Sequence, residues 1–156
     1  MTAMGAQHPL VVFTLGEQRY GLPLSSVERA VRIVEITPLP NGPDIVLGVI
    51  NVQGRLIPVV NLRRRFSLPE HEVVLTDQIV VAHTQRRPVA LVVDAIVGVL
   101  AYSQQQFVGA GEILPTAEYL DGVVKLDDGL ILIHDLEKFL SLDEALALDA
   151  AMTGGE

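Results

Sequence analysis

The stretch of sequence that decides the fold is residues 46–62, which read VLGVINVQGRLIPVVNL. Two apolar runs, Val46–Val52 and Arg55–Val60, flank the dipeptide Gln53-Gly54, and this pattern predicts a β-hairpin that turns at the dipeptide. Proline has no amide hydrogen to donate to a ladder, so Pro58 should lie on an edge strand or at a bulge. The rest of the chain is therefore expected to consist of short apolar strands joined by tight turns.

The same pattern recurs on both sides of this hairpin. Further strand pairs are predicted wherever two apolar runs flank turn residues, and these pairs cover residues 10–15 with 19–22, 78–84 with 88–94, and 119–126 with 129–133. Residues 33–39 and the bulged run 95–102 are expected to add single strands. Nine or ten short strands in a chain of this length fit either two small barrels or one sandwich.

Few segments of the sequence favour helix. Ser25 and Ser26 precede Val27–Val31, which is expected to form one or two helical turns, and residues 62–66 predict a second short helix. Asp135 is a good N-cap for a C-terminal helix over residues 135–152, with Leu136, Phe139 and Leu140 on one face.

The composition agrees with a β-rich globular chain. Its 156 residues are 49% hydrophobic and include 22 Val, 22 Leu and 10 Ile, which excludes a disordered chain and favours strands.

A formal charge of −8 argues against a nucleic-acid partner, because an acidic protein repels phosphates. The absence of cysteine excludes disulfides, thiolate zinc sites and cysteine nucleophiles. With neither a signal peptide nor an apolar run long enough to insert into a membrane, the protein is expected to be cytoplasmic.

The sequence contains no recognisable catalytic or metal-binding constellation. The four histidines are scattered, with no second ligand at metal-binding spacing, and neither serines nor glycines form a known reactive or phosphate-binding motif. Asp94 is expected to be a turn residue at a strand end. The basic run Arg63–Arg65 predicts a solvated helix with one arginine in an ion pair, and the alternative is a helix that docks an acidic partner. By elimination, the chain is expected to be a non-catalytic interaction module without cofactors.

Several blocks of the sequence resemble the CheW-like chemotaxis adaptor family. The resemblance runs in order through residues 10–22, 48–63, 92–100, 119–122 and 131–136. Residues 48–63, GVINVQGRLIPVVNLR, are similar to the family pattern G-V-x-N-L-R-G-x-I-x-P-V-x-D-L-R. The similar region spans residues 10–142, which is most of the chain.

This resemblance implies an all-β fold with a few short helices, built from two intertwined five-stranded SH3-like barrels and a C-terminal helix. The first subdomain is expected at about residues 19–77 and the second at about 78–133, with the N-terminal strand 10–15 joining the second. The implied function is a scaffold that couples the cytoplasmic tip of a chemoreceptor to the regulatory domain of a CheA-type histidine kinase. Such a protein would be recruited to membrane-bound receptor arrays without inserting into the membrane.

The resemblance also assigns binding residues. The receptor groove is expected to contain Val27, Arg29, Ala30, Gln53 and Ile79, although Val27 and Ile79 could equally be ordinary core residues. Leu24 and Gly48 match positions that face the kinase.

Three positions depart from the family pattern. Gln53 replaces an arginine, Arg29 replaces an acid, and Asn61 replaces an aspartate beside the arginine cluster. We expect Arg29 and Gln53 to lie side by side and to adapt the groove to a non-standard partner; neutral drift is the alternative. Whether kinase binding is retained is left open by these changes.

Other functions remain open from the sequence. They are an adaptor of a non-motility or kinase-independent chemosensory pathway and, from another class, a small β-barrel enzyme or ligand-binding protein.

Overall fold

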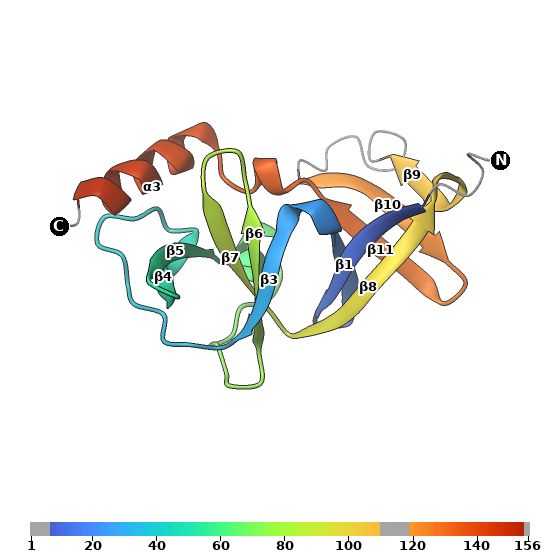
Figure 1. Cartoon of the computed structure of the whole chain (residues 1–156), viewed down its shortest axis with the longest axis horizontal. Coiled ribbons are helices and arrows are strands. Elements are labelled where there is room, and N and C mark those ends of the chain that lie inside the picture. The colour runs from blue at the N-terminus through green and yellow to red at the C-terminus, as the bar shows by residue number, and fades with distance from the viewer. Residues whose placement is uncertain (1–6, 110–118, 155–156) are drawn as a thin grey trace.

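The computed structural model describes residues 7–109 and 119–154, and these form two curved β-sheets that lie end to end (Figure 1). Sheet A has the strand order β8-β1-β2-β11-β10-β9, and sheet B has the order β3-β6-β7-β5-β4. The strands of sheet A are β1 (Gln7–Leu15), β2 (Gln18–Pro23), β8 (Ala95–Ser103), β9 (Phe107–Gly109), β10 (Leu120–Leu126) and β11 (Gly129–His134). Those of sheet B are β3 (Val27–Arg32), β4 (Val46–Val52), β5 (Arg55–Val60), β6 (Gln78–His83) and β7 (Pro88–Val93).

This architecture confirms the all-β class and the predicted hairpins. The hairpin β4–β5 turns at Gln53-Gly54, and β1–β2, β6–β7 and β10–β11 pair as antiparallel neighbours. Sheet A holds six strands rather than five because the short strand β9 pairs with β10.

The division between the sheets differs from the expected boundary at residues 77 and 78. The chain leaves sheet A after β2, forms all of sheet B from β3 to β7, and returns to sheet A with β8. Two parallel pairings that join distant segments cause this arrangement: β2 lies beside β11, and β5 lies beside β7. The hairpin β6–β7 therefore completes sheet B, and β1 and β2 both belong to sheet A.

Strand β1 connects the two cores. Leu10 and Val12 pack inside sheet A with Val124, Ile131 and Ile133. Phe13 and Leu15 pack instead in a cluster between the sheets, which we call the seam, with sheet B residues that include Val80, Ala82 and Leu91. Both faces of β1 are thus buried, which explains why residues 10–15 form a continuous apolar run.

Two segments after β2 differ from the prediction. Leu24–Ser26 form a 3-10 helix, η2, whereas Val27–Arg32, expected to be helical, form strand β3 and pair with β6. Residues 33–39, expected to form a strand, contribute only an isolated bridge from Thr37 to Val49. Long-range pairing with β6 outweighs the local capping signal of the serines, and Pro38 and Pro40 oppose a regular strand.

The C-terminal segment also differs, because it is interrupted. Asp135 caps a 3-10 helix, η4 (Leu136–Lys138), and a separate helix, α3 (Leu142–Gly154), follows. The Ser141 hydroxyl accepts from the Glu144 amide at 3.1 Å, and the Glu144 carboxylate accepts from the Ser141 amide at 2.9 Å. This capping box starts α3 at a new point, while Phe139 is buried in the seam between the two helices.

Pro58 lies in β5, which is an interior strand of sheet B and not an edge strand. On the β7 side, however, the pairing of β5 is limited to Val59 and Val60, so the missing amide hydrogen of Pro58 breaks no contact there.

Candidate protein-interaction surface

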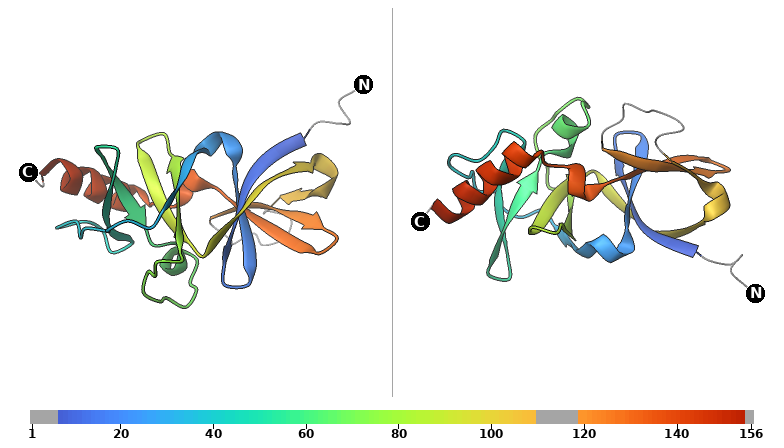
Figure 2. Two further views of the ribbon diagram at one scale, coloured as in Figure 1. Left: turned by 60° about the horizontal axis from the view of Figure 1, so that its bottom comes forward. Right: turned by 90° about the horizontal axis from the view of Figure 1, so that it is seen from above.

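A surface with exposed apolar residues lies where sheet A meets sheet B, between β3 and β8. Gln78 in β6 pairs with Arg32 at the end of β3, and its side-chain oxygen accepts from the Ile96 amide at the start of β8 at 2.6 Å. The two strands diverge from this junction on the same face of the molecule (Figure 1). They therefore border a shared surface above the seam; Figure 2 gives two further views of this junction.

Two predicted groove residues of β3 face this junction. Val27 is opposite Ala82 and Ala30 is opposite Val80, and both partners belong to the seam cluster. Side chains directly opposite each other in an antiparallel pair lie on the same face of a sheet. Val27 is partly buried against the seam, and Ala30 is exposed.

Two other predicted groove residues face the opposite side. Ile79 has an exposed fraction of 0% and belongs to the core inside sheet B, so it cannot contact a partner directly. Arg29 is opposite Val81, which lies in the same inner core. The bulge that shifts the register between Val27 and Arg29 places these neighbouring side chains on different faces.

Strand β8 supplies apolar residues that the sequence analysis did not single out. Val97 and Val99 are 61% and 62% exposed. Val99 is opposite Val11, and Val11 is opposite Leu22 of the seam cluster, so Val99 lies on the face of sheet A that meets sheet B. Residues 95–101 are all apolar or glycine, so the sequence does not mark which of these side chains are exposed.

We call the set of Leu24, Val27, Ala30, Val97 and Val99 the β3–β8 face. Leu24, predicted to face the kinase, is exposed on η2 beside β1 and belongs to this set. Contiguous exposed apolar patches on the surface of a monomer often belong to binding sites, so this set is a candidate for one.

Gln53 lies at the tip of the β4–β5 hairpin, with a positive φ of 53°. The contacts of Arg29 run instead through Glu28, whose carboxylate binds Arg55, His83 at 3.1 Å and Arg29 at 3.9 Å. The hydrogen bond from Arg55 holds the pKa of Glu28 below its usual range. Within residues 7–109 and 119–154, no hydrogen bond or ion pair joins Arg29 to Gln53.

Gly48 is buried, and its lack of a side chain allows the backbone at Thr37 to approach closely. A Cβ atom at this position would lie 2.3 Å from the Thr37 carbonyl oxygen, and its φ is +155°. The exposed apolar side chains of this hairpin are Leu47, next to Gly48 in the chain, and Leu56, which is opposite Asn51 and 60% exposed. A kinase contact in this region would therefore be made by these leucines.

The three arginines of α1 (Leu62–Arg65) each form an ion pair, rather than the single pair expected. Arg63 contacts Asp94 at 2.6 Å, Arg64 contacts Glu70 at 3.2 Å, and Arg65 contacts Glu144 at 2.7 Å. Burial alone would raise the pKa of Asp94, but hydrogen bonds from Arg63 and the Gly16 amide outweigh it and lower that pKa. The cluster thus fastens internal elements together, which argues against the acidic-partner alternative.

The residues that the structure describes offer no metal site, because no group of three or more His, Asp or Glu side chains converges. Within the same residues, no helix is long and apolar enough to cross a bilayer.

Comparison with known proteins decides the family. Residues 9–144 match the model of the CheW-like domain. The chain belongs to the CheW-like family. Three relatives are each named chemotaxis protein CheW: that of Thermotoga maritima is 32% identical over 128 residues (82% of this chain, 84% of the relative), that of Klebsiella aerogenes 30% over 141 (89% and 85%), and that of Treponema pallidum 29% over 150 (92% and 88%).

A solved structure supports the fold as well as the family. The scaffolding protein CheW of Thermoanaerobacter tengcongensis matches with a TM-score of 0.81 and 27% identity, covering 89% of this chain and 96% of that one. The protein is thus a CheW-type adaptor of chemotaxis signalling and not an enzyme, as the sequence predicted.

Proposed function

We propose that this CheW-like protein couples the cytoplasmic tip of a chemoreceptor to the regulatory domain of a CheA-type kinase. The observation that carries the proposal is the β3–β8 face, an exposed apolar surface above the junction of the sheets. Recruitment of a cytoplasmic adaptor to membrane-bound receptor arrays follows from binding at this face and needs no membrane-inserted segment of its own.

The β3–β8 face suits a helical partner. Val97 and Val99 are exposed on β8, Ala30 is small and exposed on β3, and Val27 is partly buried in the same strand. An amphipathic helix binds by laying its apolar side chains into a groove of this kind. The receptor tip is a helical hairpin in this family, so the receptor is the partner assigned to this face.

The kinase regulatory domain is assigned to the β4–β5 hairpin of sheet B. Leu47 and Leu56 are exposed on this hairpin, which also contains the family position occupied by Gly48. These leucines lie on β4 and β5, so this surface shares no residue with the β3–β8 face. Leu24, which the resemblance assigns to the kinase, is exposed on η2, and we propose it as a receptor contact instead.

Val99→Glu is expected to weaken binding of a receptor cytoplasmic fragment by at least about 30-fold, because it buries an unpaired charge at an apolar contact. The same variant should bind the kinase regulatory domain within about twofold of the unchanged protein. Isothermal titration calorimetry with both partners from the same genome measures these affinities, and circular dichroism checks the fold.

Two matched variants complete the test. Leu56→Glu should weaken kinase binding and spare receptor binding, while Leu75→Glu, at a site 89% exposed outside both surfaces, should change neither. A Val99→Glu protein that binds the receptor fragment normally would overturn the groove assignment. Receptor binding without any kinase binding by the unchanged protein would favour the kinase-independent alternative.

A further inference from the structure

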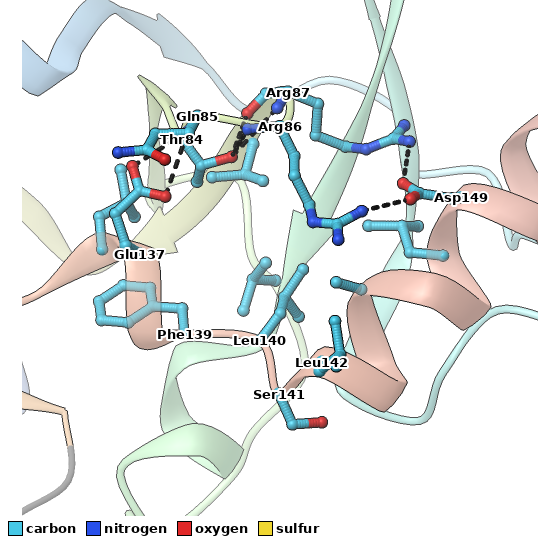
Figure 3. A pocket seen from close by; sticks show the side chains of 15 residues that line it. Thr84, Gln85, Arg86, Arg87, Glu137, Phe139, Leu140, Ser141, Leu142 and Asp149 are labelled. Atoms are coloured by element: carbon cyan, nitrogen blue, oxygen red, sulfur yellow. Dashed lines mark hydrogen bonds and ion pairs between the residues drawn. The ribbon is translucent and has the colours of Figure 1, made fainter.

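A cavity lies beneath helix α3, away from the β3–β8 face. It has a volume of about 290 Å³ and is bounded by the turn between β6 and β7, by η4 and by α3 (Figure 3). Its floor consists of side chains that are each at most 5% exposed, namely Val60, Val89, Leu136, Phe139 and Leu148. The cavity therefore opens directly onto the hydrophobic core.

The cavity is open to solvent at its mouth, and its space is far larger than the small voids of a closely packed protein interior. It corresponds to the volume of roughly ten water molecules at about 30 Å³ each. Helix α3 contributes the small residue Ala145 to the wall, so the helix does not fill the space. Water gains little in such a place because the floor offers it no hydrogen-bond partners, whereas an apolar group gains burial.

The mouth of the cavity is polar on the side of the β6–β7 turn. Arg86 donates to Asp149 at 2.6 Å, and Arg87 binds the other oxygen of the same carboxylate. Two guanidinium groups thus share one carboxylate, and each ion pair engages a single nitrogen of its arginine. Since a guanidinium has five N–H donors, both arginines keep donors for a further anion.

The opposite wall carries Glu137. Both of its oxygens accept from the Gln85 amide, at 3.0 and 3.1 Å, so this carboxylate is held against the turn. Figure 3 shows Glu137 and the arginine side chains at separate sides of the cavity. An anion is therefore favoured beside Arg86 and disfavoured beside Glu137, which orients an elongated ligand.

We propose that this cavity binds a small apolar monocarboxylate, an alkyl or arylalkyl acid of about ten non-hydrogen atoms. The carboxylate of the ligand binds the free donors of Arg86, and its hydrocarbon chain covers the floor beneath α3. Charge complementarity at the arginine pair selects the acid, and the enclosed apolar floor selects the chain. This site is separate from both proposed partner surfaces, so its test does not depend on receptor or kinase binding.

The test is a titration of the full chain, labelled with nitrogen-15, with octanoate. In NMR spectra, the backbone amide signals of the β6–β7 turn and α3 are expected to shift until the site is saturated. The dissociation constant should be about 1 mM or tighter. Octanamide, which has the same shape and no charge, should bind at least about tenfold more weakly. Equal binding of the two ligands, or no saturable shift in these segments, would overturn the proposal.

Two variants locate the contact. Arg86→Leu removes one guanidinium while Arg87 still holds Asp149, and it should weaken octanoate binding about tenfold. Ala145→Phe fills the cavity and should abolish binding. Arg32→Leu, an exposed arginine of β3, is the matched control and should bind octanoate as the unchanged protein does. Unchanged affinity in Arg86→Leu would remove the assigned role of this residue, even if Ala145→Phe failed to fold.

Discussion

Replacing Gly48 with alanine should destabilise the protein by about 3 kcal/mol or more, although the change adds a single methyl group. The new Cβ atom would lie 2.3 Å from the Thr37 carbonyl oxygen, and the φ of +155° at this position is one that residues with a side chain rarely adopt. Thr37 and Val49 exchange two backbone hydrogen bonds, of 2.9 and 2.8 Å, so the clash breaks the only described bridge between residues 33–39 and β4. Urea unfolding measures the loss.

Gly54→Ala is the control for this experiment. Gly54 also has a positive φ, of +88°, but a Cβ atom there would meet nothing within 4 Å. Its replacement should cost only the backbone strain, about 1 kcal/mol. If the free energy of unfolding falls by a similar amount in both variants, the close approach of Thr37 does not explain the need for glycine at position 48. If Gly48→Ala also loses kinase binding, its affinity for the kinase should be compared with that of Leu56→Glu. The latter variant changes an exposed side chain and leaves the backbone at position 48 intact.

The local part of the fold could be read from the sequence because its signals are local. Turns such as Gln53-Gly54 and Asp127-Asp128 lie between apolar runs, and each hairpin was predicted at the right place. The pairings that decide which strand belongs to which sheet are different. Strand β2 joins β11 across more than a hundred residues, and no local pattern marks such a partner.

The surface residues show the same division between local and distant information. The resemblance to the family pointed to Val27 and Ala30, which do face the junction of the sheets. It also pointed to Ile79, but alternation along β6 places that side chain in the inner core. Val97 and Val99 could be recognised as exposed only after β8 was placed at the edge of sheet A.

The two charge departures from the family pattern gain a simple interpretation from the structure. The acid missing at position 29 is present at position 28, and the arginine missing at position 53 is present at position 55. Glu28 and Arg55 bind each other across sheet B. The chain thus keeps an acid–arginine pair in this region with shifted positions, and Arg29 is an added cation beside it.

Acidification should destabilise the protein through His134 before most carboxylates titrate. This side chain is buried and stacks on Phe66 with ring centroids 4.0 Å apart, near Tyr20 and Phe139. Burial lowers its pKa from 6.5 to about 4, and only the hydrogen bond between Nδ1 and the Tyr119 carbonyl oxygen opposes that shift. The folded protein therefore holds a neutral imidazole over a range in which the unfolded chain takes up a proton.

The direction of the effect follows from this difference in proton binding. The unfolded state binds more protons between the two pKa values, so the free energy of unfolding is unaffected by His134 above about pH 6.5 and falls as the pH decreases toward 4. The expected loss from this residue is about 2–3 kcal/mol between about pH 7.5 and about pH 4.5. Urea unfolding at a series of pH values measures it.

His134→Phe separates this contribution from that of the carboxylates. Phenylalanine can stack on Phe66 in the same place but cannot be protonated, and it loses the contact with the Tyr119 carbonyl, which should cost about 1 kcal/mol at every pH. Asp94 and Glu144, whose pKa values are lowered, contribute equally to both proteins and cancel in the difference between them. The unchanged protein should therefore be the more stable of the two near neutral pH and the less stable below about pH 5. Parallel curves for the two proteins would mean that His134 is not held neutral by burial in the aromatic cluster.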